Sequence, residues 1–357
     1  MVFATDFNGK TDSDILQNAV DGRGADGIVI IGPRPGKAHW LLDRAILLPG
    51  DTTVVLQNCK LKLSDRCRDN FFRSANCGLG IADPQPLQNI HIRGEGLCIL
   101  EGADHPRATD DGGKLLHAPC PHLKEDLCKM ADWIPPERRT VETMTFFDVH
   151  DHSYGTDAND PKESHYGDWR GIGVLFANVK NFSVSGLKVV RSHGWGLSFE
   201  ACTYGRIEKI EFDATMYQEI DGIKMNMENQ DGIDIRNVIA HSYLCYVIRV
   251  LPADTHIYNV VIDGIINTSP NCHAAGDTVN LGSSGGYGEA LPDGLRNVTV
   301  SNVICRGRRS VHVYGHMLDS VISNVVNLNP ACEAVSTQFE DSLQNVSITN
   351  AVTIREE

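Results

Sequence analysis

The sequence predicts an all-β fold, a single-stranded right-handed parallel β-helix in which successive coils of the chain stack on one another. Short β-rich runs recur from residue 171 onward at intervals of about 25 to 32 residues. Most are followed by a second run that begins Asn-Val or Asn-Phe. Turns are rich in Asn, Asp, Gly and Ser, and no helical period is seen there. A β-sandwich, the competing all-β fold, gives no reason for this Asn-led run to recur.

The two kinds of run divide each coil into two strands. The first runs are residues 171–176, 196–199, 222–225, 247–250, 278–281 and 310–313. The second runs begin at Asn181, Asn259, Asn297, Asn324 and Asn345. We expect each run to stack on the equivalent run of the next coil.

The N-terminal part of the chain predicts a cap. Residues 14–20 have the pattern of one short amphipathic helix, and Ser13 or Asp14 can cap it. Such a helix would cover the open end of the solenoid, where the apolar interior would otherwise face water. The apolar residues that share one face of this helix are Ile15, Leu16, Ala19 and Val20. The first strands are expected at residues 27–31, 53–56 and 61–63.

Length divided by about 150 residues suggests two domains, but all-β folds often run longer as one unit, and the recurring coils favour one solenoid. The chain has 357 residues, of which 41% are hydrophobic and 22% charged, as in a globular protein with a sizeable core. Residues 101–170 break the coil pattern and are rich in His, Asp, Pro and Trp. We expect a single β-helix domain over residues 1–357, with an inserted loop lobe at about 101–170 that borders a binding groove.

Charge excludes some partners. The formal net charge is −14, whereas binding to nucleic acid needs a basic surface. No stretch of 18 apolar residues occurs, so we expect no membrane partner either. The 11 cysteines are scattered without a Cys-x-x-Cys pair and suggest buried free thiols in a reducing compartment. We therefore expect a cytoplasmic protein, the alternative being a secreted or periplasmic one whose signal peptide is absent from the sequence.

Four segments together resemble the pectin-lyase-like superfamily, in particular glycoside hydrolase family 28, the polygalacturonase-like enzymes. They are Asp6-Phe-Asn-Gly-Lys-Thr-Asp12 with Leu16-Gln-Asn-Ala-Val20, Ile92-Arg-Gly-Glu-Gly96, the coil from Val174 to Trp195, and Asn229-Gln-Asp-Gly-Ile-Asp234. The resemblance covers most of the chain outside residues 101–170. It implies a parallel β-helix and a carbohydrate substrate.

The active-site motifs of that family are only partly present. The family pattern is Asn-Thr-Asp, Asp-Asp, Gly-His-Gly and Arg-Ile-Lys on successive coils. Here the matching positions after the first motif read Cys245-Tyr246, Gly276-Asp277 and His312-Val-Tyr314. The active site is therefore divergent, and loss of the paired aspartates leaves the family mechanism open.

The register of the first aspartate has two solutions. Asp231 fits the family motif, but it lies only 15 residues before Tyr246. Asp221 lies 25 residues before Tyr246, which is one coil. The sequence near 236–238 also reads as though a coil were absent there. Taking the spacing, we predict one outward column of Trp195, Asp221, Tyr246, Asp277 and Arg309 and a second of Ser198, Lys224, Arg249, Asn280 and His312.

These columns predict carboxylate chemistry. Coils stack at about 4.8 Å, so aspartates two coils apart can hold the separation that an inverting glycosidase needs. One carboxyl would protonate the leaving oxygen and the other would activate water. The candidate catalytic residues are Asp221, Asp231 and Asp277. Aspartate before glycine is also a common turn residue, so a purely structural role remains the alternative for each.

Cationic and aromatic residues near the same columns are candidates for substrate binding. Lys224, Arg249 and His312 can recognise a uronate carboxylate or a sulfate, or they can neutralise the aspartates. Trp195 and Tyr246 can stack on a sugar ring or pack. The full set of candidate binding residues is Trp169, Trp195, Glu200, Lys224, Tyr246, Arg249, His312 and Tyr314.

A metal or other cofactor is not expected. Asp148, His150 and His152 alternate on a probable strand, and His165 and Asp168 follow, but their spacing matches no defined metal-ligand set. We expect this region to act as a lid over the groove.

The sequence thus predicts a glycoside hydrolase that acts on a uronic-acid-containing or pectic glycan. A polysaccharide lyase with Lys224 or Arg249 as the base is the first alternative. A β-helix that binds carbohydrate without cleaving it is the second, since the paired aspartates are missing.

Overall fold

The computed structural model describes most of two compact units, Met1–Asp231 and Gly232–Glu357. The described residues are 1–65, 67, 69–78, 81, 83–104, 173–190, 196–213, 215–220, 223–228, 233–236, 246–252, 255–267, 277–282, 291–306, 309–339 and 341–354. Of these, 215–220, 223–228, 233–236, 246–249 and 251 are described by their backbone alone. The lobe expected at about 101–170 lies almost entirely outside the described residues, which reach 104 and resume at 173.

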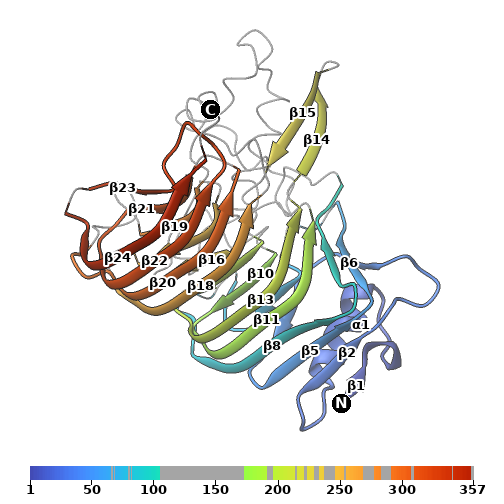
Figure 1. Cartoon of the computed structure of the whole chain (residues 1–357). Coiled ribbons are helices and arrows are strands. Elements are labelled where there is room, and N and C mark those ends of the chain that lie inside the picture. The colour runs from blue at the N-terminus through green and yellow to red at the C-terminus, as the bar shows by residue number, and fades with distance from the viewer. Residues whose placement is uncertain are drawn as a thin grey trace, which may run out of the picture. The chain divides into compact units, whose positions relative to one another are not determined.

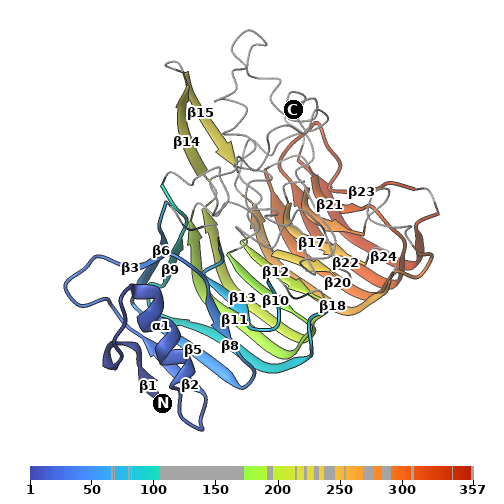
Figure 2. The ribbon, with the colours of Figure 1, turned by 180° about the vertical axis from the view of Figure 1, so that it is seen from behind.

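The first unit begins with its cap. Strand β1 (Val2–Phe3) and the 3-10 helix η1 (Ala4–Asp6) precede helix α1 (Asp12–Asp21), which lies across the end of the strand stack (Figure 2). The four predicted apolar residues of the helix are buried, so the capping role is confirmed. The N-cap residue, however, is Thr11: its hydroxyl accepts from the Asp14 N–H, and the Asp14 carboxylate accepts from the Thr11 N–H. Asp14 is therefore the third helical residue of a capping box, not the cap itself.

Two parallel sheets follow in the first unit. Their strands lie side by side in coil order (Figure 1). The first sheet contains β2 (Ile28–Ile31), β5 (Thr52–Gln57), β8 (Leu87–Glu95), β11 (Val179–Val190) and β13 (Thr203–Asp213), together with β3 (Trp40–Leu42), β6 (Lys60–Leu63) and β9 (Ile99–Glu101). The second contains β4 (Ile46–Leu48), β7 (Phe72–Ser74), β10 (Val174–Ala177) and β12 (Leu197–Glu200).

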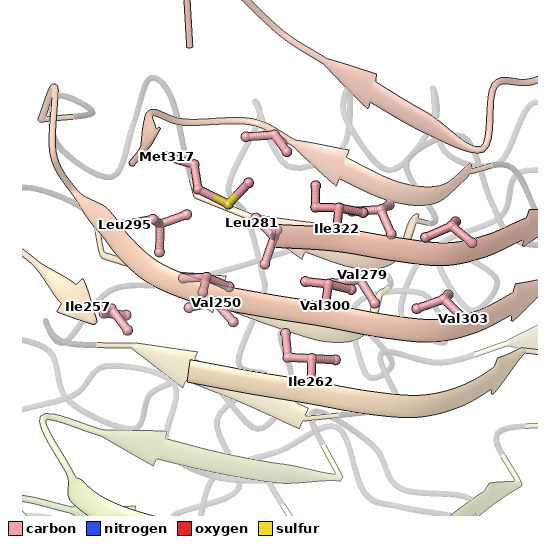
Figure 3. Close-up of a cluster of buried hydrophobic side chains, with 14 of the residues drawn as sticks. Val250, Ile257, Ile262, Val279, Leu281, Leu295, Val300, Val303, Met317 and Ile322 are labelled. Atoms are coloured by element: carbon pink, nitrogen blue, oxygen red, sulfur yellow. The ribbon is translucent and has the colours of Figure 1, made fainter. Parts of the chain in front are cut away.

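The second unit repeats this arrangement. One sheet is formed by β18 (Ile257–Asn267), β20 (Leu295–Cys305), β22 (Met317–Asn327) and β24 (Leu343–Thr353). The other contains β16 (Ile233–Arg236), β17 (Tyr246–Leu251), β19 (Asp277–Leu281), β21 (Arg309–Val313) and β23 (Val335–Thr337). Aliphatic side chains from both sheets meet in one core, including Val250, Val279, Val300 and Ile322 (Figure 3).

Parallel pairing between successive coils makes each unit a parallel β-helix. Strand β18 pairs with β20, β20 with β22, and β22 with β24, all in parallel. A β-sandwich would instead have antiparallel sheets. The predicted fold class is therefore confirmed.

The recurrent asparagines occupy backbone bends. Asn181, Asn259, Asn297, Asn324 and Asn345 all have φ between +53° and +60°, in the left-handed region. Asparagine tolerates this region better than other residues with a Cβ. Their side chains also bond from coil to coil: for example, Asn297 Nδ2 donates to Asn259 Oδ1 at 2.6 Å. The repeat thus marks bends held by ladders of amides.

One predicted coil is wrong. The run 222–225 was expected to stack as a parallel strand before Tyr246. Instead, β15 (Ile223–Glu228) pairs antiparallel with β14 (Thr215–Ile220), which places Lys224 opposite Glu219. The two runs are separated by only two residues, so a local hairpin forms in place of a long-range parallel pairing.

The strand beside β17 comes from a later segment. β16 pairs with β17 so that Ile233 lies opposite Ile248 and Asp234 opposite Arg249. This offset of 15 residues is the spacing between Asp231 and Tyr246, not the 25-residue spacing between Asp221 and Tyr246. The prediction that residues 222–225 lie beside β17 is therefore wrong, because the observed offset of 15 residues is shorter than the 25-residue coil on which the prediction rests.

The structure also bears on the predicted free thiols and on the predicted lack of a membrane-spanning segment. Seven cysteines there are free, and Cys59, Cys67, Cys77, Cys98 and Cys305 are buried. Burial raises the pKa of the Cys59 and Cys77 thiols to about 12, so both are held as unreactive thiols. No helix among the described residues is both long and apolar enough to cross a membrane.

Candidate functional site

The structure brings the predicted columns together in the second unit. Asp277 of β19 lies between Tyr246 of β17 and Arg309 of β21. In the next column, Asn280 lies between Arg249 and His312. The predicted register of β17, β19 and β21 is therefore confirmed.

A break in strand alternation puts Asp277 and Asn280 on the same side. Thr278 is buried and its hydroxyl accepts from Asn267 Nδ2 of β18 at 3.1 Å, so it points into the coil. Val279 also belongs to the core. With two consecutive residues directed inward, Asp277 and Asn280 both lie outside, where Asn280 Nδ2 donates to Asp277 Oδ2 at 3.0 Å.

Asp277, Asn280, Arg309 and His312 form one buried polar group, which we call the Asp277 cluster. Asp277 is 2% exposed and His312 is 3% exposed. Arg309 Nε lies 3.0 Å from Asp277 Oδ1, and His312 Nδ1 lies 2.9 Å from Asp277 Oδ2. Arg309 and Asp277 thus form an ion pair, but the geometry between Nε and Oδ1 is not that of a hydrogen bond.

One tautomer of His312 fits its hydrogen bonds. If Nδ1–H donates to the Asp277 carboxylate, Nε2 is left to accept from Arg309 Nη1, which lies 2.9 Å away. The 2.7 Å approach of the same Nη1 to Nδ1 then cannot be a hydrogen bond, because Nδ1 already donates to Asp277. With Nδ1 as donor and Nε2 as acceptor, each ring nitrogen has one hydrogen-bond partner.

This arrangement suits a positioned acid–base group. The Asp277 carboxylate fixes the tautomer and orientation of His312, as a carboxylate does for a catalytic histidine. Tyr314 packs edge-on against His312, with ring centroids 5.1 Å apart. Charged groups buried in this way cost desolvation free energy that apolar residues would avoid, so such a cluster is a functional-site candidate.

The other predicted residues fall into three groups. Glu200 belongs to the first unit, where it is fully buried on β12 and accepts from Ser198 Oγ at 3.3 Å. The backbone alone is described for Lys224, Tyr246 and Arg249. Trp169, Trp195, Asp221 and Asp231 lie outside the described residues, as do Asp148, His150, His152, His165 and Asp168.

Two members of the Asp277 cluster were not among the predicted site residues. Arg309 and Asn280 were assigned to the columns, but neither was chosen as a site residue. Their positions in the predicted columns could have identified them, because Arg309 lies next to Asp277 and Asn280 next to His312. Within the described part of the chain, no group of three His, Cys, Asp or Glu side chains could hold a metal ion.

Comparisons with known proteins give structural likeness only. No protein-family model matches the sequence, and no curated protein matches it. The chain is similar to the surface adhesin PfbA of Streptococcus pneumoniae, with 10% identity, 99% of this chain and 92% of that chain covered, and a TM-score of 0.44. It is also similar to an exopolygalacturonase of Thermotoga maritima, with 14% identity, 98% and 92% coverage, and a TM-score of 0.43.

A polygalacturonase of Erwinia carotovora ssp. carotovora is similar at 12% identity, with 98% of this chain and 93% of that chain covered and a TM-score of 0.42. The fold assignment rests on the strand pairing described above, and these likenesses carry no conclusion about activity.

Proposed function

We propose that this protein is a glycoside hydrolase that acts on a uronic-acid-containing or pectic glycan. The observation that carries the proposal is the Asp277 cluster: a buried carboxylate, imidazole and guanidinium in adjacent columns on the outer side of a parallel β-helix sheet. A carboxylate supplies acid–base or water-activating chemistry, and a guanidinium matches the carboxylate of a uronate.

Hydrolysis needs a second carboxylate if one carboxyl group is to protonate the leaving oxygen and the other is to activate water. Asp221, Asp231 and Asp277 remain the proposed catalytic set. The 15-residue offset between β16 and β17 equals the spacing from Asp231 to Tyr246, so it favours Asp231 over Asp221 as the partner carboxylate. Arg249 and Tyr246 border the Asp277 cluster by register and are the proposed contacts to substrate.

One observation favours a second candidate, a β-helix that binds glycan without cleaving it. Asp277 is already engaged by Arg309, His312 and Asn280, so its carboxylate can act as an organiser of the cluster and not as the reacting group. The cytoplasmic location stays a prediction, with a secreted or periplasmic protein as the alternative.

The deciding experiment is a product assay with polygalacturonate and hexagalacturonate as substrates. Hydrolysis adds a reducing end without an unsaturated product, whereas a lyase produces an unsaturated uronate that absorbs in the ultraviolet. For a hydrolase, Asp277→Asn should lower kcat by about 10²- to 10⁴-fold. The exposed Asp341→Asn serves as the matched control and should leave kcat unchanged.

The Asn variants of Asp221 and Asp231 complete the test. If all three Asn variants keep full activity, the carboxylate mechanism is wrong. Ultraviolet-absorbing products would establish the lyase alternative. Binding of hexagalacturonate without any product would establish the binding protein.

A further inference from the structure

The outer side of the β18–β20–β22–β24 sheet carries an open polar groove that the proposed active site does not use. One hollow, of about 470 Å³, is lined by Tyr258, Asn259, Arg296, Asn297 and Asp319. A second, of about 540 Å³, continues from Asp319 to Asn345 and Ser347. Asp319 lines both hollows, so they adjoin across four coils, and we call the pair the ladder groove.

Three amides and one carboxylate line the floor of the ladder groove, those of Asn259, Asn297, Asp319 and Asn345. Asn297 Nδ2 donates to Asn259 Oδ1 at 2.6 Å, and Asn345 Nδ2 donates to Asp319 Oδ1 at 2.8 Å. Each amide nitrogen carries two hydrogens, and each ladder bond uses one of them. The row therefore offers regularly spaced donors and acceptors at about 4.8 Å intervals, over a length of about 14 Å.

Apolar surface flanks this row. Tyr258 precedes Asn259 on β18, and its side chain is 65% exposed. Val261 is 74% exposed and Val321 is 40% exposed, and both lie in one column two residues beyond the amides. A single exposed apolar residue needs no explanation, but a ring and two valines along the ladder groove give it an amphipathic wall.

The charges in the groove cancel. Arg296 pairs with Asp319, with Nη2 and Oδ2 3.0 Å apart. A neutral ligand therefore fits the groove better than a uronate chain or a nucleic acid.

We propose that the ladder groove is a second, non-catalytic site for an extended neutral glycan chain. Sugar hydroxyls donate and accept hydrogen bonds, as do the amides, and the C–H face of a pyranose packs on an aromatic ring such as Tyr258. The sugar units of a glycan chain repeat along its length, as the polar side chains of successive coils do along the floor of the groove. This site is on a different sheet from the Asp277 cluster and does not depend on the proposed hydrolase activity.

The test is titration calorimetry of the full chain with cellohexaose, a flat neutral glycan. Tyr258→Ala should weaken binding by at least about fivefold, because the stacking face is lost. Asn297→Gly should also weaken it, since glycine accepts the left-handed backbone at this position but has no amide. The matched control is Tyr204→Ala, which removes an exposed tyrosine next to the amide ladder of the first unit.

The outcomes are distinct. Loss of cellohexaose affinity in Tyr258→Ala and Asn297→Gly, with Tyr204→Ala and Asp277→Asn binding as the wild type does, supports the site. Equal binding by wild type and both groove variants overturns it, as does the absence of wild-type binding. Groove-dependent binding of hexagalacturonate in place of cellohexaose overturns the neutral class. Far-ultraviolet circular dichroism of each variant separates loss of contact from loss of fold.

Discussion

Single residues explain the most frequent signal in the sequence, the asparagine that begins the second run of a coil. Asn324 is one of these, and in register it lies between Asn302 of β20 and Asn350 of β24; the three residues have φ of 54°, 56° and 52°. Asn324 Nδ2 donates to Asn302 Oδ1 at 3.2 Å, and Asn350 Nδ2 donates to Asn324 Oδ1 at 3.0 Å. Backbone geometry and side-chain bonding thus select the same residue type.

Substitution of Asn324 separates these two contributions. Asn324→Gly keeps the left-handed backbone accessible and removes only the ladder bonds, so we expect a loss of about 0.5–1.5 kcal/mol in the free energy of unfolding. Asn324→Ala keeps a Cβ in the left-handed region but loses the short polar side chain that makes this region accessible to asparagine, so it should cost about 1–2 kcal/mol more than Asn324→Gly. Urea unfolding measures both. Equal losses for the two variants would contradict the role of the bend.

Helix α1 shows how one element depends on a buried charge. The Asp12 carboxylate is 3% exposed and accepts from Arg34 Nε at 3.0 Å and from the Leu41 N–H at 3.0 Å. Burial alone would raise the pKa of Asp12, but the Leu41 N–H, Arg34 and Lys37 together hold the pKa below its usual value. The ionised carboxylate therefore ties the first turn of the cap to the coil beneath it.

This lowered pKa makes the cap sensitive to acid. Asp12 is ionised in the folded state at pH values where it is already protonated in the unfolded chain, so its contribution is present above about pH 4 and lost as pH falls further. Asp12→Asn should cost about 1–3 kcal/mol at pH 7. The gap to wild type should close toward pH 3 in urea titrations at stepped pH. The exposed Asp6→Asn should show no such gap.

At the scale of whole units, stability comes from the interior shared by the two sheets. Ile322 is fully buried and lies between Val300 and Ile348 in register, within the core shown in Figure 3. Its neighbour Val321 points outward and is 40% exposed. The two positions differ by one residue but face opposite sides of the sheet.

These neighbours provide a matched pair of variants. Ile322→Ala leaves a cavity in the core and should lower the free energy of unfolding by about 2–5 kcal/mol. Val321→Ala removes surface contacts only and should cost less than about 1 kcal/mol. Chemical denaturation of the full chain measures both. A loss at Val321 as large as at Ile322 would mean that the assigned faces of β22 are wrong.

The sequence by itself determined the features that depend on local conformation or on a regular period. The coil repeat and the register of Tyr246, Asp277 and Arg309 follow from spacing, because equivalent positions of stacked coils recur at coil intervals. The capping helix follows from its amphipathic pattern. The asparagine bends follow from the conformational preferences of one residue type.

Only the tertiary structure decided features that depend on competition between distant and local partners. The hairpin of β14 and β15 replaced an expected coil, because two adjacent runs can pair with each other before either finds a distant strand. Likewise, the spacing gave Asp277 its column but not its partners. Asp277 is buried against Arg309, His312 and Asn280 because strand alternation breaks at Thr278. In a regular strand, the side chains of Asp277 and Asn280 would lie on opposite sides of the sheet, but here they lie on the same side.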